Sequence, residues 1–189
     1  MPAATLTAFE PRKTPVQARA TVTVEAICEA TIQVLLSHGA ERLTTTRVAD
    51  RAGVSVGTLY QYYPHKQSLL YAVMEEHLNR VATAVESACE RAREKPLAEM
   101  IKQVVEVFVD AKMDRAEISV ALYKVAADIG GPELVKRAGQ RMRKAVEAML
   151  HSALDIESAL DTFAIDTMLA AMSGTMRSML EARRSLICF

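Results

Sequence analysis

Residues 44–66, TTTRVADRAGVSVGTLYQYYPHK, constrain the fold of this chain more than any other stretch. Thr44 is a good helix N-cap, and Gly53 stands where the chain must leave that first short helix, at a position that favours a left-handed residue without a Cβ. Ser55 is a good N-cap for a second short helix, and Pro64 disfavours helical geometry at the residue before it. The stretch therefore predicts a helix-turn-helix.

The second short helix has two faces of different chemistry. Leu59 and Tyr63 lie four residues apart on the side predicted to face inward. The other side is small, hydroxylic or amide-bearing and carries no charge: Val56, Gly57, Thr58, Gln61 and Tyr62. Such a face suits a helix N-terminus that lies against base edges in the major groove of DNA.

Hydroxyl groups and a cation surround that face. The hydroxyls suited to phosphate oxygens belong to Thr44, Thr45, Thr46, Tyr60 and Tyr62. Lys66 lies at the predicted start of the next helix, where a cation opposes the macrodipole and a bound phosphate would reconcile the two. Each residue alone has an ordinary explanation as a cap, a packing aromatic or a solvated charge. Their combined spacing favours a DNA contact surface.

The run GVSVGTLYQYYPHKQSLL resembles the signature of the TetR-type one-component transcriptional repressors, and the resemblance covers about the first third of the chain. It implies phosphate contacts from Thr45, Tyr60 and Lys66. It also implies base contact or close groove approach from Thr46, Val56, Gly57, Thr58 and Tyr62. With Ser55 and Gln61 these residues make up the predicted DNA-binding set. Thr46, Tyr63 and His65 depart from the family's usual residues, which leaves the operator sequence open.

The rest of the chain favours an all-α fold. It has 189 residues, of which 50% are hydrophobic, so it can bury a substantial core. Glycine and proline are scarce, and no strand-like alternation runs for any length. We expect a flexible basic arm over residues 1–21, which is either a DNA contact or an ordinary frayed terminus. We expect a three-helix helix-turn-helix DNA-binding domain over 22–66, and a larger antiparallel helical domain for ligand binding and dimerisation over 67–189.

Composition and spacing argue against several other classes of protein. A net charge of zero speaks against nonspecific coating of nucleic acid. Cys28, Cys89 and Cys188 are an odd number and lie far apart, which suggests a reduced compartment without a disulfide framework, metal or cofactor. No leader sequence and no apolar run near 18 residues stands out, so we expect neither secretion nor membrane spanning. We expect a cytoplasmic location instead. No catalytic spacing of histidines or carboxylates is found, so the chain is not expected to be an enzyme.

The middle helices are interpreted as a pocket for a small molecule. Its predicted apolar lining consists of Phe108, Leu122, Tyr123, Val125, Met142 and Phe163. A Met-rich wall would adapt to a bulky hydrophobic effector. The same residues at the same spacing would also form a dry helical core. A basic face nearby, which includes Arg141 and Arg143, is interpreted as solvated rather than as a nucleic-acid surface.

The last helix, predicted over residues 156–184, carries a stripe of small residues. Ala170, Gly174 and Ser178 stand four apart, and small residues at that spacing let a partner helix approach closely. Packing within the same subunit explains the pattern equally well. The family resemblance implies dimerisation through the last two helices. The apolar tail 185–189 follows where many such repressors carry a further helix.

Together these features predict a cytoplasmic, homodimeric repressor that binds a near-palindromic operator in double-stranded DNA and is released by a small hydrophobic effector. Effector binding would move the long helix after Lys66 and so change the separation of the two helix-turn-helix domains in the dimer. One alternative is a constitutive DNA-binding regulator without an effector. Another is a helical-bundle enzyme or protein-interaction module, which would lack DNA affinity.

Overall fold

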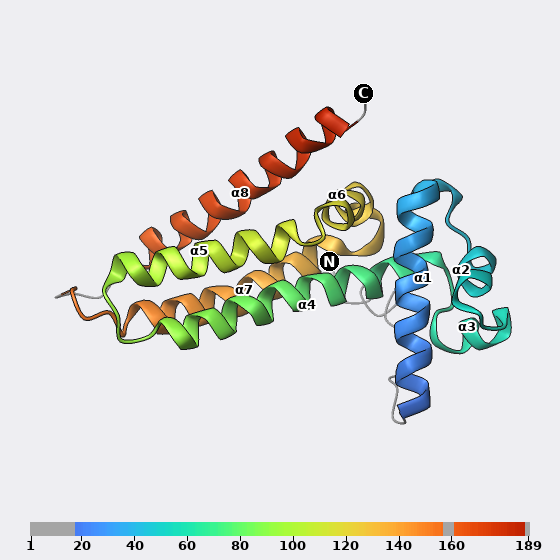
Figure 1. The fold of residues 1–189 in the computed structure, drawn as a ribbon, viewed down its shortest axis with the longest axis horizontal. Helices are drawn as coiled ribbons and strands as arrows, with labels where there is room; N and C mark the ends of the chain where they lie inside the picture. Colours follow the sequence, from blue (N-terminus) through green and yellow to red (C-terminus); the bar gives the residue numbers. More distant parts are fainter. Residues whose placement is uncertain (1–17, 157–160, 188–189) are drawn as a thin grey trace, which may run out of the picture. The chain divides into compact units, whose positions relative to one another are not determined.

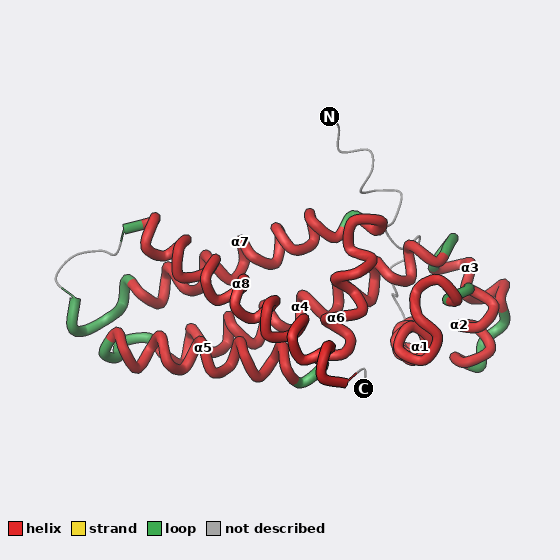
Figure 2. The backbone as a smooth tube through the Cα atoms, turned by 90° about the horizontal axis from the view of Figure 1, so that it is seen from above, coloured by secondary structure: helices red, strands yellow, loops and turns green. Residues whose placement is uncertain are grey.

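The computed structural model describes residues 18–156 and 161–187, and within these ranges every regular element is a helix. Figures 1 and 2 show the helices along the chain. The elements are α1 (Ala18–Arg42), α2 (Thr45–Ala52), α3 (Val56–Tyr62), α4 (Lys66–Ala92), α5 (Leu97–Met113), α6 (Ala116–Val125), the 3-10 helix η2 (Ala126–Ile129), α7 (Gly131–Leu150) and α8 (Thr162–Ile187). The predicted all-α fold is confirmed. Most of the predicted arm lies outside the described residues, as does Cys188.

Both ends of the last helix differ from those predicted. The last helix begins at Thr162 rather than at 156, and it continues through most of the predicted tail to Ile187. Both differences concern helix ends, where hydrogen bonds to neighbouring segments decide the boundary.

The described chain forms two compact units. The N-terminal unit contains residues up to His77 together with Ala121–Leu134, and the helical-bundle unit contains Leu78–Val120 together with the residues from Val135 onward. Helix α4 runs from the first unit into the second. The predicted division at residue 66 coincides with the start of α4 and stays a prediction.

The core of the N-terminal unit forms between α1 and the two short helices. Helix α1 buries Ile27, Ala30 and Val34, which recur at the three- and four-residue spacing of one helical face. Val48 of α2 and Leu59 of α3 are fully buried as well, and α2 packs against both α1 and α3. This packing fixes the positions of α2 and α3, because a short helix is not stable alone.

Helix α1 corrects one expectation from the sequence. Its segment Ala20–Arg42 is long and apolar enough, at a mean hydropathy of 1.3, to cross a membrane by length and composition alone. The same helix supplies buried residues to the N-terminal unit, among them Ile27 and Val34. A core helix of a globular protein passes the same test, so this segment is weak evidence for a membrane span.

The helical-bundle unit packs the second part of α4 with α5, α7 and α8. Its core includes Val85, Val104, Phe108, Val146 and Met176, each at most 5% exposed. The connection between α4 and α5 is held by the segment after α7, because Ser152 Oγ accepts from the Glu94 backbone N–H at 3.1 Å and Asp155 Oδ1 accepts from the Leu97 N–H at 2.7 Å. The second contact caps the N-terminus of α5.

Candidate nucleic-acid interface

The first short helix of the interface is closed at both ends by its own sequence. Thr44 is its N-cap, and its hydroxyl accepts from the Arg47 backbone N–H at 3.3 Å. Gly53 follows its last residue with φ 68° and ψ 27°, the left-handed conformation that glycine adopts without strain. Val54 N then donates to the Ala49 carbonyl at 3.0 Å. These contacts produce the tight turn before α3.

The second short helix has a capped beginning and a buried end. Ser55 Oγ accepts from the Thr58 N–H at 3.0 Å and lies 2.8 Å from Thr58 Oγ1. Leu59 is fully buried, and Tyr63 follows α3 in extended geometry with only 2% of its surface exposed. These two side chains fill the inward side, and the other residues of α3 are exposed or half-buried.

The end of α3 is held against α1 by an uncharged pair. Cys28 Sγ lies 3.6 Å from the Tyr63 hydroxyl. Burial raises the pKa of the Cys28 thiol, and burial likewise raises the pKa of Tyr63 well above its ordinary value. Both groups are therefore neutral at physiological pH, and the Cys28 thiol is a poor nucleophile there. The pair positions α3 rather than performing chemistry.

None of the ten predicted DNA-binding residues is buried. Five are exposed: Thr46, Ser55, Gly57, Tyr60 and Gln61. Five are half-buried: Thr45, Val56, Thr58, Tyr62 and Lys66. They come from the first turn of α2, from α3 with its N-cap, and from the first residue of α4, so three helices contribute to one accessible set within the N-terminal unit.

Two of the predicted phosphate ligands contact each other. The Thr45 hydroxyl of α2 lies 3.1 Å from the Tyr60 hydroxyl of α3. The pair has two hydroxyl hydrogens and uses one of them internally, so the other is available to an outside acceptor. A phosphate oxygen is such an acceptor, and the internal bond orients both groups before any ligand arrives.

The N-terminus of α4 is capped by His65 in a way that sequence reasoning missed. Its ring Nδ1 accepts from the Ser68 N–H at 3.2 Å, and Ser68 Oγ accepts from the His65 N–H at 3.3 Å. This is the reciprocal arrangement of a capping box with an imidazole in the role of the usual hydroxyl or carboxylate. Lys66 begins the helix that this cap fixes. The signal in the sequence was the serine three residues after the histidine.

Arg47 is a second residue that the predicted set lacks. It lies exposed in the first turn of α2, directly after Thr46, and one of its guanidinium nitrogens donates to the Arg42 carbonyl at 2.9 Å. Arginine is a common partner of phosphate. Its place directly after a run of three threonines was the signal available in the sequence.

The helical-bundle unit contains a cavity of only about 50 Å³. Its lining residues are Val85, Val104, Phe108, Gly139, Met142, Val146, Leu169, Met172 and Ser173. Phe108 and Met142 were predicted to line a pocket. Phe163 is 76% exposed and lies outside this cavity, while the predicted residues Leu122, Tyr123 and Val125 belong to the N-terminal unit.

The predicted dimer stripe lies on the outer side of α8. Ala170, Gly174 and Ser178 are all exposed, and a Cβ added at Gly174 would meet no atom within 4 Å. Ile165 and Met176, on the opposite side of the helix, are buried. Among the described residues nothing covers the stripe, so packing of these three residues within the same subunit does not explain their spacing.

Two family models match the chain. The one described as "Bacterial regulatory proteins, tetR family" matches residues 27–73, which include α2, α3 and the cap of α4. The one described as "Tetracyclin repressor-like, C-terminal domain" matches residues 96–186. Together they span most of the chain, the first over the N-terminal helices and the second over the helices from α5 onward.

Individual relatives are similar to parts of the chain. The HTH-type transcriptional repressor KstR of Mycobacterium tuberculosis is 40% identical over 55 residues, 29% of this chain and 25% of the repressor. The HTH-type transcriptional regulator BetI 1 of Chromohalobacter salexigens is 24% identical over 128 residues, 68% of this chain and 61% of the regulator. The chain thus spans from a quarter to about three fifths of the length of these relatives.

The fold of a solved structure extends over nearly the whole chain. The fatty acid degradation regulator FadR from Bacillus halodurans matches with a TM-score of 0.70 and 19% identity, over 93% of this chain and 88% of that one. At this identity the likeness concerns the fold. Two family models match successive parts of the chain, a repressor is similar to part of it, and a solved regulator shares its fold. The chain therefore belongs to the tetR family of bacterial regulatory proteins.

Proposed function

We propose that this protein is a sequence-specific DNA-binding transcriptional regulator, with repression as its mode of action, and not an enzyme. The observation that carries the proposal is the accessible, uncharged face of α3, flanked by the Thr45 and Tyr60 hydroxyls and by Lys66 at the N-terminus of α4. An uncharged helix face can approach base edges, while hydroxyls and a cation beside it bind the phosphates that fix its register. Arg47 joins this proposed phosphate set.

The proposal is tested by selecting binding sites from a random duplex library and sequencing them. We expect a near-palindromic site whose half-sites lie one helical turn apart, about 34–36 Å, and an affinity that falls steeply with salt.

Tyr60→Phe tests the phosphate-contact set, because it keeps the ring and removes only the hydroxyl bonded to Thr45. It should bind the selected site about tenfold more weakly, the loss of one hydrogen bond to a charged group. Selection of no sequence by the wild-type chain would remove the DNA-reading role.

Dimerisation through α8 is the second part of the proposal. A two-fold symmetric interface presents the same surface on both subunits, and small residues at Ala170, Gly174 and Ser178 would let the two helices approach closely. The exposure of this stripe in the single chain supports it. A dimer would place two copies of α3 on one face of DNA, which is why a near-palindromic operator is expected.

We expect Gly174→Arg to convert the dimer into a folded monomer. Near the symmetry axis the two added cations face each other, and the longer side chains hold the helices apart, so the dimer dissociation constant should rise by about 100-fold or more. Sedimentation velocity measures this, and circular dichroism checks the helix content. Ala98→Arg, at an exposed position of α5, is the matched control and should leave the dimer intact. A Gly174→Arg dimer of wild-type affinity would move the interface elsewhere.

A response to a small hydrophobic effector is the third part of the proposal. The cavity in the helical-bundle unit has the right chemistry, since methionine, leucine and phenylalanine side chains line it. At about 50 Å³ it is far smaller than the roughly 300–1,000 Å³ of typical ligand sites, so binding requires the surrounding helices to separate. A constitutive regulator is the alternative, and the small cavity is the observation in its favour.

A further inference from the structure

Helix α7 carries two arginines on either side of a residue that lines the cavity. Met142 is part of the lining. Arg141, the residue before it, bonds to α4, and Arg143, the residue after it, donates to Asp166 of α8 at 2.6 Å. Both α4 and α8 also contribute lining residues, Val85 and Met172 among them. The sequence predicted a solvated basic face here. Both arginine side chains are partly exposed, and they also connect the helices that enclose the cavity.

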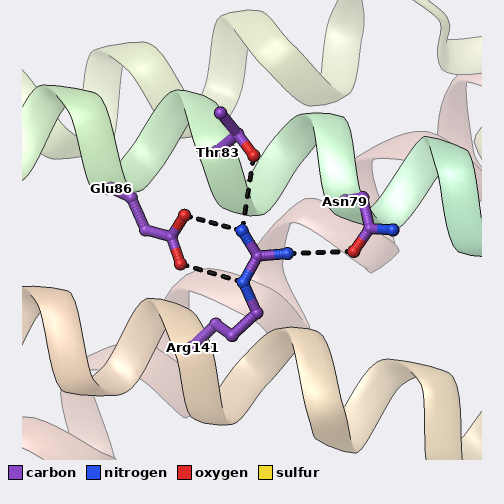
Figure 3. A network of polar contacts seen from close by, with 4 residues as sticks. All are labelled: Asn79, Thr83, Glu86 and Arg141. Carbon is purple, nitrogen blue, oxygen red and sulfur yellow. Dashed lines mark hydrogen bonds and ion pairs between the residues drawn. The ribbon is translucent and has the colours of Figure 1, made fainter.

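The contacts of Arg141 form the larger of the two connections (Figure 3). Its Nε donates to Glu86 Oε1 at 2.9 Å and its Nη2 to Glu86 Oε2 at 2.7 Å, a bidentate pair. Its Nη1 donates to Asn79 Oδ1 at 2.9 Å, and its Nη2 also reaches Thr83 Oγ1 at 3.3 Å. One guanidinium thus binds three side chains spaced along two turns of α4. We call these four residues the Arg141 network.

The Arg141 network is placed to respond to the size of the cavity. Glu86 directly follows Val85, and Arg141 directly precedes Met142, so each partner of the ion pair adjoins a lining residue. If the cavity expands by separation of α4 from α7, the four hydrogen bonds must lengthen and break. Exposed ion pairs are individually weak, so a ligand can overcome them, whereas a bidentate pair with two further bonds still favours one helix position.

We propose that Arg141 is the positioning residue that couples this cavity to α4: the network holds α4 in its DNA-binding position while the cavity is contracted, and releases it when a hydrophobic molecule expands the cavity. This inference rests on the proposed effector-responsive regulator. Helix α4 is continuous from Lys66 to Ala92, so a shift of its second part reaches the cap at His65 and the phosphate-contact residue Lys66. Contracted and expanded cavities are then two states that DNA and effector stabilise differently.

The test uses Arg141→Met in the full-length chain and two separate readouts. The first is the binding of the apolar fluorescent probe anilinonaphthalene sulfonate without DNA, and the second is affinity for the operator selected by the wild type. Without the network the expanded state is easier to reach, so probe affinity should rise by about three- to tenfold and operator affinity should fall by a similar factor. Lys102→Met is the matched control, because the partner of Lys102 is on the same helix, at 3.9 Å. It should change neither readout.

A second variant removes the bidentate pair of the network from the side of α4. Glu86→Ala should change both readouts in the same direction but by less, because Asn79 and Thr83 still accept from Arg141. The double variant should match Arg141→Met, because the removed contacts of Glu86 are all to Arg141. Glu86→Ala also keeps the test decisive if Arg141→Met fails to fold. Unchanged probe and operator affinities in both variants, or additive effects, would overturn the coupling. If the wild type selects no operator, the proposed function fails. The probe affinities of the variants still test whether the network holds the cavity contracted.

Discussion

Gly57→Leu should abolish operator binding and leave the fold intact. Gly57 lies exposed in the first turn of α3, and a Cβ there would meet only Ser55 Oγ, at an ordinary contact distance of 3.7 Å. Leucine is also a better helix former than glycine. The unfolding midpoint should therefore stay the same or rise. On DNA, however, the leucine would stand between α3 and the groove floor and keep its neighbours Val56 and Thr58 from base edges.

The expected loss of operator affinity is about 100-fold or more, equivalent to roughly 2.7 kcal/mol. Titration of the selected operator measures it, and thermal unfolding measures stability on the same samples. Gly57→Ala is the matched control, because one methyl group tests the closeness of approach without blocking it. It should lose less than about tenfold and gain stability. Equal operator affinities for Gly57→Leu and wild type would mean that the N-terminal half of α3 does not enter the groove.

The helix-turn-helix could be predicted from the sequence because its signals are local. A hydroxyl N-cap such as Thr44 or Ser55 acts on backbone groups two or three residues away, and the left-handed geometry of Gly53 is a property of that residue. The accessible face of α3 follows in turn from one buried residue, Leu59. Within such a short stretch, spacing alone determines which side chains point outward.

The cavity could not be predicted in the same way, because helical spacing shows which residues share a face and not which helices meet. Phe163 is apolar and correctly spaced, yet it is 76% exposed. Leu122 is buried, but in the other compact unit. Phe108 and Met142 do line the same cavity, together with residues from α4 and α8 that the sequence did not point to. Tertiary contacts between distant segments decide each of these outcomes.

Polar contacts were the other class of feature that the sequence did not specify. The ion-pair partners of the basic face of α7 could not be found from the sequence, because Glu86 and Asp166 are 55 and 23 residues away from Arg141 and Arg143. His65 looked like a departure from a small cap because imidazole is not among the favoured N-cap groups. In the fold its Nδ1 accepts the hydrogen bond that a smaller cap would accept. Such contacts depend on side-chain geometry rather than on residue type.

Leu59→Ala should destabilise the N-terminal unit and leave the helical-bundle unit protected. The Leu59 side chain is fully buried and is the buried residue of α3. Removing it should cost about 2–5 kcal/mol, the sum of lost apolar transfer and the space left behind. Helices α2 and α3 are short and depend on tertiary packing, so this loss should open them before other parts of the chain. Operator binding should disappear as a consequence.

Amide hydrogen exchange followed by mass spectrometry distinguishes the two units. Peptides from α2 and α3 should exchange much faster in Leu59→Ala, while peptides from α5 and the second half of α7 should keep wild-type rates. Leu36→Ala, a matched deletion at a side chain 43% exposed, should cost less than about 1 kcal/mol and change neither set. Equal acceleration in α5 and α7 would show that the two units unfold as one. The energy lost with one buried leucine would then be spread over both units rather than confined to the N-terminal unit.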